Sequence, residues 1–484
     1  MEVTTIKTLG ELKQFGYASR SIKVELRENL IAHLKNKTTP FTGVIGYENT
    51  VLPELERAIL SMHNINLLGL RGQAKTRIAR AMVNLLDPFI PVVSGSEIND
   101  DPLQPISKFA IDLIAEMADK TPISWLAREE RFFEKLATPD VSVSDLIGDI
   151  DPIKAANLKL SYADPRVLHF GMIPRANRCI FVINELPDLQ ARIQVSLFNI
   201  LQEGDIQIRG FKLRLPIDIQ CVFTANPEDY TNRGSIVTPL KDRIGSQILT
   251  HYPKDIETAK KITAQESGQQ ILPIKVPELA RDLLEQISFE ARESDYIDLK
   301  SGVSARMSIT AFQNLMSTAE RRLLLSDEES TTIRLSDFTG IYPAITGKVE
   351  LVYEGEQEGA DFVAQHLLES AIKTLFDARF PKIKKLEKKD AEGPYDPLLL
   401  WFFESEGFEL LEDFSDSMYR DQLDRITPLT ALLKEYAPGV DKETNYFLKE
   451  LVLWGLVANN KLSKHSFSNG TEFKDLYGSY INGL

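Results

Sequence analysis

The chain has 484 residues, a length at which two or three domains are expected. A hydrophobic content of 43%, a charged content of 26% and the lack of an apolar run of roughly 18 residues exclude a membrane-spanning class. The net charge of −14 argues against a broad nucleic-acid-binding face, although a local basic patch stays open.

Residues 1–38 are expected to be helical and polar, with Leu26, Leu30 and Leu34 at helical spacing. The first residues do not have the pattern of a signal peptide. From residue 39 to 253, amphipathic helices alternate with four apolar runs, INLLGL, FIPVVSG, CIFVINE and IQCVFTANP. This alternation predicts an α/β domain with a parallel sheet that helices cover on both faces.

Residues 100–178 are long for a simple crossover, and three segments there predict inserted helices: PISKFAIDLIAEMADK, LAREERFFEKLA and SVSDLIGDIDPIKAANLKL. Farther on, EGDIQIRGFKLRL alternates apolar and polar residues about Gly210, which predicts a β-hairpin. Its basic residues Arg209, Lys212 and Arg214 are either a nucleic-acid contact or simply a solvated strand face.

The remaining chain reads as helical. Residues 254–340 have an almost wholly helical pattern, and 341–394 form a connecting segment that ends in a lysine-rich linker candidate before Gly393 and Pro394. Residues 395–484 are expected to form a small, mostly helical C-terminal domain.

The strongest motif follows the first apolar run. The sequence GLRGQAKT nearly matches G-x-x-x-x-G-K-[ST], in which backbone N–H groups at a helix N-terminus cradle phosphates. Lys75 would then reach the β- and γ-phosphates, and the Thr76 hydroxyl would bind Mg²⁺. Ala74 replaces the last glycine, which the loop tolerates if φ stays negative. The predicted cofactors are ATP and Mg²⁺, with nucleotide-binding residues Gly69, Gly72, Gln73, Ala74, Lys75, Thr76 and Arg77.

The run CIFVINE has the order and position of a second phosphate-side strand. Glu185 is expected to polarise the attacking water, and Asn184 to lie near the Mg²⁺ shell. An amide brings no negative charge, so Asn184 predicts a reduced turnover. On its own, the same run could be a core strand with a polar end.

Three further polar groups follow in chain order. Asn226 ends the next apolar run and is expected to orient water opposite Glu185. Arg243 is a candidate arginine finger toward a neighbouring subunit, and Arg306 is a candidate sensor within the subunit. Each arginine could instead be a solvated surface residue.

With these motifs in order, residues 40–335 resemble the AAA+ ATPases, in the branch of the magnesium chelatase ATPase subunit and the MoxR-like proteins. The segment PFTGVIGYENTVLPELERAIL is similar to the family's opening segment, and GMIPRANRCIFVINELPDLQARIQVSLFNILQEGDIQIRGFKLRLPIDIQCVFTANPED to its core. The resemblance implies a P-loop AAA+ core with three layers, a helical lid at 254–340, and an adenine site lined by Val44, Ile45 and Gly46. Asn184 departs from the family, which has an aspartate at this position.

Cys179 and Cys221 both lie in apolar runs, which predicts reduced core cysteines in a cytoplasmic protein. The resemblance also implies a homo-oligomer, a hexameric ring, that works with a partner carrying a von Willebrand A domain. We expect an ATP-hydrolysing motor that remodels a partner or metalloprotein client. The alternatives are a genuine magnesium chelatase motor subunit, which inserts Mg²⁺ into protoporphyrin, and a weakly hydrolysing ATP-dependent scaffold or switch. A nucleic-acid partner and membrane insertion are not expected.

Overall fold

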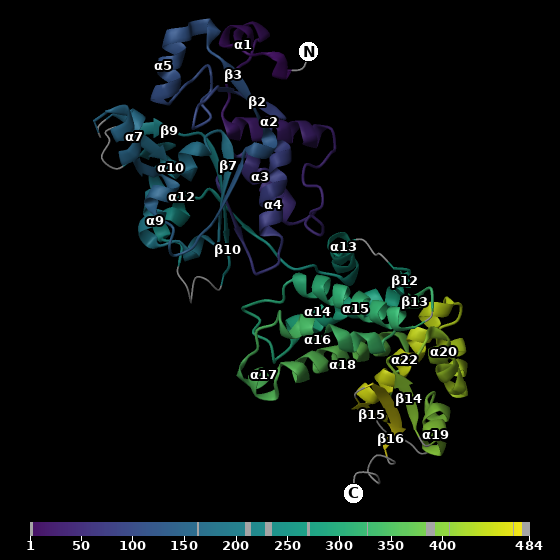
Figure 1. Ribbon diagram of the computed structural model, residues 1–484. Coiled ribbons are helices and arrows are strands. Elements are labelled where there is room, and N and C mark those ends of the chain that lie inside the picture. Colours follow the sequence, from purple (N-terminus) through teal and green to yellow (C-terminus); the bar gives the residue numbers. More distant parts are fainter. Residues whose placement is uncertain are drawn as a thin grey trace. The chain divides into compact units, whose positions relative to one another are not determined.

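The computed structural model describes residues 3–161, 164–208, 214–227, 235–268, 272–326, 328–383, 393–405, 407–467 and 469–476. The chain divides into two compact units, Met1–His251 and Tyr252–Leu484 (Figure 1). The boundary between the sequence-predicted AAA+ domain and lid lies two residues farther along, and the finer division into five segments stays a prediction.

The centre of the first unit is a five-stranded parallel sheet. Its spatial order is β11 (Ser246–Leu249), β1 (Ile65–Leu68), β10 (Ile219–Ala225), β7 (Cys179–Asn184) and β4 (Phe132–Leu136). Every neighbouring pair is parallel, so the carboxyl ends of all five strands lie along one edge of the sheet. The predicted α/β core with a parallel sheet is confirmed.

Both faces of this sheet are covered, which explains why its central strands are apolar throughout. Successive residues of β7 point to opposite sides, so that Ile180 and Val182 join one hydrophobic cluster while Phe181 and Ile183 join another. Helices of the first cluster are α2 (Ile22–Lys35), α3 (Val51–Leu60) and α4 (Lys75–Ala81). Helices of the second are α9 (Ala191–Ser196), α10 (Phe198–Gln202) and α12 (Thr238–Arg243), and Figure 1 shows the two groups on opposite sides of the sheet.

Two sequence-based assignments in this unit are wrong. The run FIPVVSG forms β2 (Phe89–Val93), which pairs antiparallel with β3 (Ile123–Ala127) in a separate two-stranded ribbon. The segment LAREERFFEKLA was predicted to be an inserted helix, but Phe132–Leu136 is the edge strand β4 of the main sheet. Glu, Lys and Leu favour a helix locally, and pairing with β7 overrides that preference.

The insertions of the first unit are built from short elements. The predicted hairpin is present as β8 (Asp205–Gln207) antiparallel to β9 (Arg214–Pro216), and its turn, with Arg209, Gly210 and Lys212, lies outside the described residues. The other elements are α1 (Leu9–Phe15), α5 (Lys108–Met117), α6 (Val143–Leu146), β5 (Gly148–Ile150), α7 (Pro152–Leu158), β6 (Leu168–Phe170) and α8 (Met172–Arg175).

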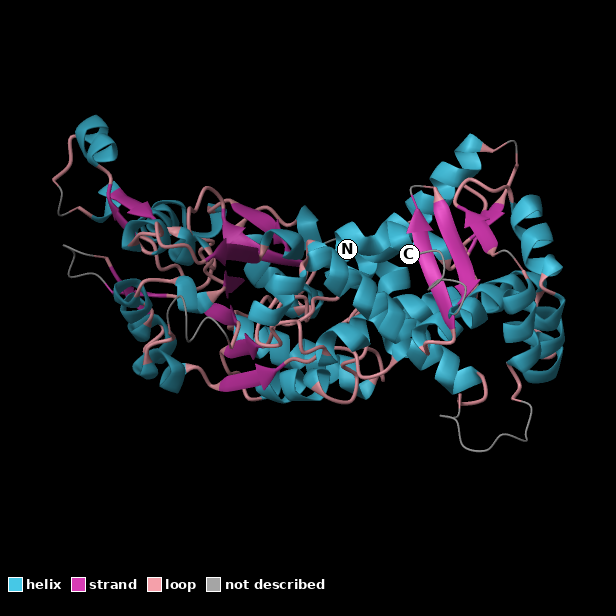
Figure 2. Ribbon diagram, turned by 90° about the horizontal axis from the view of Figure 1, so that it is seen from below, coloured by secondary structure: helices cyan, strands magenta, loops and turns pink. Residues whose placement is uncertain are grey.

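The second unit is mainly helical (Figure 2). Its helices are α13 (Ile256–Glu266), α14 (Glu278–Glu293), α15 (Arg306–Leu325), α16 (Tyr342–Thr346), α17 (Tyr353–Glu358), α18 (Ala360–Arg379), α19 (Asp396–Glu404), α20 (Asp416–Arg425), α21 (Thr427–Tyr436) and α22 (Lys442–Ala458). One hydrophobic cluster runs through it, from Ile274 to Phe473. Most of the proposed linker, 384–392, lies outside the described residues.

The second unit also contains strands that the sequence analysis did not anticipate. The strands β12 (Ile274–Lys275) and β13 (Thr331–Thr332) pair in parallel. An antiparallel sheet has the order β14 (Phe408–Leu411), β16 (Gly470–Asp475) and β15 (Leu462–Phe467). The dipeptide Asn469-Gly470, where β16 begins, is a hairpin signal that could have revealed this pair.

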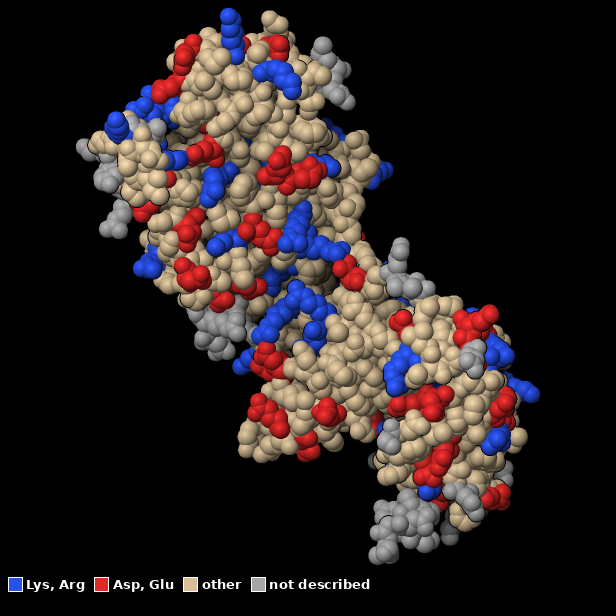
Figure 3. Space-filling model, in the orientation of Figure 1, with Lys and Arg blue, Asp and Glu red and all other residues tan. Residues whose placement is uncertain are grey.

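The surface carries both signs of charge. On the face shown in Figure 3, acidic and basic side chains are interspersed over the first unit. Within the described ranges, no helix has the length and apolar character needed to cross a bilayer.

Candidate functional site

The phosphate-binding loop predicted from the sequence lies at the carboxyl end of β1, between β11 and β10 in the sheet, and leads into α4. The Lys75 side chain turns back over the loop, where its ammonium donates to the carbonyl oxygens of Gly69 and Leu70 and, at 2.7 Å, to Asn226 Oδ1. Lys75 is only 7% exposed. The three oxygen acceptors offset the cost of burying this cation.

Gly69 is required by close packing. A Cβ at this position would lie 1.9 Å from Thr250 Oγ1 and 2.2 Å from Gln73 Oε1. The Thr250 hydroxyl itself donates to Gln73 Oε1 at 2.7 Å. Gln73 therefore fastens the middle of the loop to the end of β11, and only a glycine leaves room for that contact.

The loop turns through left-handed backbone conformations. Gly72 has φ of 70° and Ala74, the N-cap of α4, has φ of 55°. The expectation that Ala74 keeps a negative φ is wrong, because the chain must reverse direction between the loop and α4. A left-handed residue with a Cβ costs roughly 1–2 kcal/mol. Ala74 also offers no side-chain cap, which leaves the start of α4 without a side-chain acceptor.

Asn226, which follows β10, joins the loop to Glu185. Its Oδ1 accepts from Lys75, and its Nδ2 donates to Glu185 Oε2 at 3.3 Å. The Glu185 backbone is left-handed, with φ of 54°, and its N–H donates to Thr224 Oγ1 at 3.1 Å. The structure thus brings together Lys75, Asn226 and Glu185 from segments that follow three parallel strands, β1, β10 and β7. Strained backbone such as that of Glu185 is concentrated at functional sites.

Asn184 has both ends of its amide engaged. Its Oδ1 accepts from Thr224 Oγ1 at 3.1 Å, and its Nδ2 donates to Glu134 Oε1 at 2.5 Å. Glu134 lies on β4 and also accepts from Arg80 of α4, at 2.7 and 3.1 Å. Sequence reasoning missed Glu134, because its segment was assigned to a helix. The adjacent aromatic residues Phe132 and Phe133, of a type enriched in strands, were the available signal.

The predicted adenine-side residues lie next to the loop. Val44 is buried in the hydrophobic cluster that covers one face of the sheet, and Gly46 has φ of 83°. Arg77 of α4 donates to Gly43 O at 2.9 Å, and the Tyr47 hydroxyl donates to Gln73 O at 2.9 Å. Contacts on both sides of Val44, Ile45 and Gly46 therefore anchor that segment to the loop and α4.

The two candidate arginines make other contacts. Arg243, at the end of α12, donates to Gln202 Oε1 at 2.9 Å and to Pro239 O at 2.7 Å, and its guanidinium lies over the Phe198 ring. Arg306 is exposed at the start of α15, in the second unit. The described contacts of neither residue include the loop, so their roles stay predictions.

The donor set fits a nucleotide with Mg²⁺. Mg²⁺ in such sites keeps several waters and takes one or two protein groups together with phosphate oxygens. The described part of the chain holds no group of three or more His, Cys, Asp or Glu side chains that could bind a metal ion. Lys75 and the loop would hold phosphate, and the Thr76 hydroxyl the ion.

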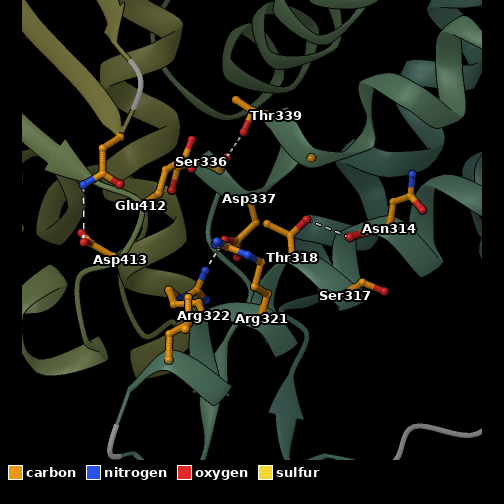
Figure 4. Close-up of a pocket in the computed structure, with 13 residues that line it drawn as sticks. Asn314, Ser317, Thr318, Arg321, Arg322, Ser336, Asp337, Thr339, Glu412 and Asp413 are labelled. Atoms are coloured by element: carbon orange, nitrogen blue, oxygen red, sulfur yellow. Dashed lines mark hydrogen bonds and ion pairs between the residues drawn. The ribbon is translucent and has the colours of Figure 1, made fainter.

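The second unit has a polar cavity of about 440 Å³ (Figure 4). Side chains of its wall pair with one another: Arg322 binds Asp337 in a buried ion pair, and Asn469 Nδ2 donates to Asp413 at 3.4 Å. None of the sequence-predicted site residues lines this cavity.

No protein-family model matches the chain. The chain is 24% identical over 328 residues to the magnesium-chelatase subunit ChlI of Euglena gracilis, which covers 63% of this chain and 88% of the relative. Two solved structures are also similar. A complex of the magnesium chelatase subunits BchI and BchD matches at 18% identity, 66% of this chain, 98% of the other and a TM-score of 0.35. A candidate ATPase from Cytophaga hutchinsonii matches at 17% identity, 74% of this chain, 97% of the other and a TM-score of 0.30.

The similarity to the chelatase subunit accompanies a parallel sheet and a glycine-containing loop in the first unit. The chain is thus similar in sequence to a magnesium chelatase subunit, in agreement with the resemblance of its motifs to that branch of the AAA+ ATPases.

Proposed function

We propose that this chain binds ATP with Mg²⁺ and hydrolyses it. The observation that carries the proposal is the continuous link from Lys75 through Asn226 to Glu185, which joins a phosphate-binding cation to a carboxylate. A general base must lie within hydrogen-bond reach of the water that it activates, and a fixed amide beside it can orient that water.

Each residue has a distinct task in this proposal. Lys75 and the backbone of the loop bind the phosphates, and Thr76 binds the metal. Glu185 accepts the proton of the attacking water, and Asn226 holds the Glu185 carboxylate in position. Val44, Ile45 and Gly46 contact the adenine. Bound Mg²⁺ would neutralise charge on the phosphate oxygens.

We further propose that the hydrolysis drives a ring of identical subunits, six in number, with Arg243 reaching the neighbouring site and Arg306 sensing the nucleotide within the subunit. The relative's description as a subunit supports work with a second protein. We expect that partner to carry a von Willebrand A domain and the ring to remodel a client. Mg²⁺ insertion into protoporphyrin is the alternative, and it requires a porphyrin-binding subunit in the same genome.

A second candidate function is a weakly hydrolysing ATP-dependent scaffold or switch. The observation in its favour is Asn184, a neutral amide whose two ends are both engaged, by Thr224 and Glu134. In this function ATP stabilises the ring and is turned over slowly.

Steady-state ATP hydrolysis by four proteins tests the proposal: the wild type, Lys75→Ala, Glu185→Gln and Asn184→Asp. The wild type should hydrolyse ATP at least about 100-fold faster than Glu185→Gln, since general base catalysis contributes that much or more. Lys75→Ala should lose nucleotide binding, whereas Lys35→Ala, an exposed lysine at the end of α2, should behave as the wild type.

The outcomes separate the two functions. A wild type that binds ATP but turns over no faster than Glu185→Gln contradicts the motor and supports the switch. A faster Asn184→Asp shows that the amide limits turnover. The partner is tested with the ATP-loaded Glu185→Gln variant. A purified von Willebrand A domain protein should co-elute with this variant in size-exclusion chromatography.

A further inference from the structure

Glu134, Asn184 and Thr224 form a row of polar side chains on one face of the sheet. In the register of β4 and β7, Glu134 lies opposite Val182, two residues before Asn184. Residues two apart in a strand share a face, and Val182 belongs to the cluster beneath α2, α3 and α4. The hydrogen bonds from Thr224 to Asn184 and from Asn184 to Glu134 follow this row.

The row ends beside the helix that carries Thr76. Arg80, which binds Glu134, is four residues after Thr76 on α4, so the two side chains share a helix face about 6 Å apart along the axis. The Arg80 side chain is 64% exposed and that of Glu134 is 24% exposed. Because the Arg80 side chain is so exposed, its ion pair with Glu134 is weak. Stabilisation by this pair therefore does not explain why position 134 is a carboxylate.

We propose that Glu134 supplies, on the magnesium side of the nucleotide site, the negative charge that Asn184 lacks. This proposal depends on the proposed function, since it assumes that the loop binds ATP with Mg²⁺. Glu134 is a positioning residue: it acts through the Asn184 amide, which it orients and polarises by accepting from Nδ2. A carboxylate next to a metal shell attracts the hydrated cation, and partners of this kind typically change metal affinity by ~10–100-fold.

The test measures the affinity of the full chain for a fluorescent ATP analogue, with Mg²⁺ and with EDTA. The ratio of the two affinities is the magnesium enhancement. Glu134→Gln should lower this ratio about 10-fold and leave the affinity in EDTA unchanged. Glu129→Gln is the matched control, because Glu129 is also next to an arginine but is exposed and outside the row, and its ratio should equal that of the wild type.

Rescue separates an electrostatic role from a structural one. Asn184→Asp alone places two carboxylates side by side. The double variant Glu134→Gln with Asn184→Asp moves the negative charge from position 134 to its hydrogen-bond partner at position 184, and it should recover the magnesium enhancement. Arg80→Gln removes the cation that competes with Mg²⁺ for the charge of Glu134, so it should raise the magnesium enhancement. This variant tests the proposal even if thermal unfolding shows that Glu134→Gln is destabilised.

An unchanged ratio in Glu134→Gln, or a double variant that stays as low as the single one, would overturn the proposal. An Arg80→Gln ratio no higher than that of the wild type would do the same. The proposed function fails separately: then the wild type binds the nucleotide no better than Lys75→Ala, with or without Mg²⁺.

Discussion

The ammonium of Lys75 and the amide oxygen of Asn226 lie 2.7 Å apart, although 151 positions separate the two residues in the chain. The contact exists because β1 and β10 are neighbours in the parallel sheet, so that the segments after both strands start at the same edge. The other end of the same amide holds Glu185, which follows β7, the next strand of the sheet.

Asn226→Ala should slow hydrolysis about 100-fold and leave nucleotide binding within a few-fold of the wild type. Losing one preorganised hydrogen-bond donor typically costs about that much in rate. Single-turnover hydrolysis and equilibrium binding measure the two effects. Asn199→Ala, an exposed asparagine on α10, is the control and should change neither. Equal rates for Asn226→Ala and the wild type would remove Asn226 from the mechanism.

Ala74→Gly should stabilise the first unit by about 0.5–1 kcal/mol. The left-handed conformation costs an alanine about 1–2 kcal/mol, and glycine avoids this cost. Glycine also has more conformational freedom in the unfolded chain, which offsets part of the stabilisation. Urea unfolding measures the difference. Ala156→Gly, an exposed position within α7, should instead destabilise by about 1 kcal/mol. A loss of stability in Ala74→Gly would show that the left-handed conformation of Ala74 does not strain the native backbone.

Glu25→Ala should destabilise the first unit by about 3–5 kcal/mol, because it leaves the buried Arg131 without its partner. The two side chains are 4% and 1% exposed, and the carboxylate accepts from Arg131 Nη1 at 2.7 Å and Nη2 at 2.6 Å. Burial acts to lower the pKa of Arg131, but the hydrogen bond and charge of Glu25 outweigh it and raise that pKa.

Chemical unfolding measures this change. Replacing both partners by apolar residues, as in Glu25→Leu with Arg131→Met, should recover much of the loss, since no unpaired charge then stays buried. A double variant as unstable as Glu25→Ala would show that the loss has another cause.

The two cysteines should not react with a thiol reagent at pH 8 until the protein unfolds. Cys179 and Cys221 are buried and form no disulfide, and burial raises the pKa of each thiol from 9.0 to about 12. Titration with Ellman's reagent, with and without denaturant, measures this. Fast labelling of the native protein would contradict the burial.

The same shift has a consequence for stability. Between about pH 9 and 12 the native state keeps the thiol protons that the unfolded chain releases, so this contribution to stability is complete below about pH 9 and is lost as pH rises toward 12. Cys221→Ser should reduce the loss of stability at alkaline pH. Unfolding midpoints of the variant and the wild type at pH 8 and pH 11 measure the difference.

The sequence by itself determined the loop and the strands that frame it. The pattern around Lys75 and the apolar runs of β1, β7 and β10 depend on local spacing and on burial of both sheet faces, which leave their mark in neighbouring residues. The order of the motifs was also enough to expect Glu185 and Asn226 on one edge.

Tertiary structure alone decided which segments join the sheet. Phe89–Val93 is apolar but pairs outside it, whereas the more polar Phe132–Leu136 becomes its edge strand, because strand pairing depends on distant partners. The same pairing places Glu134 beside Asn184, and the reversal of the chain at α4 forces Ala74 into a left-handed conformation. Such contacts join residues far apart in sequence, and no local pattern encodes them.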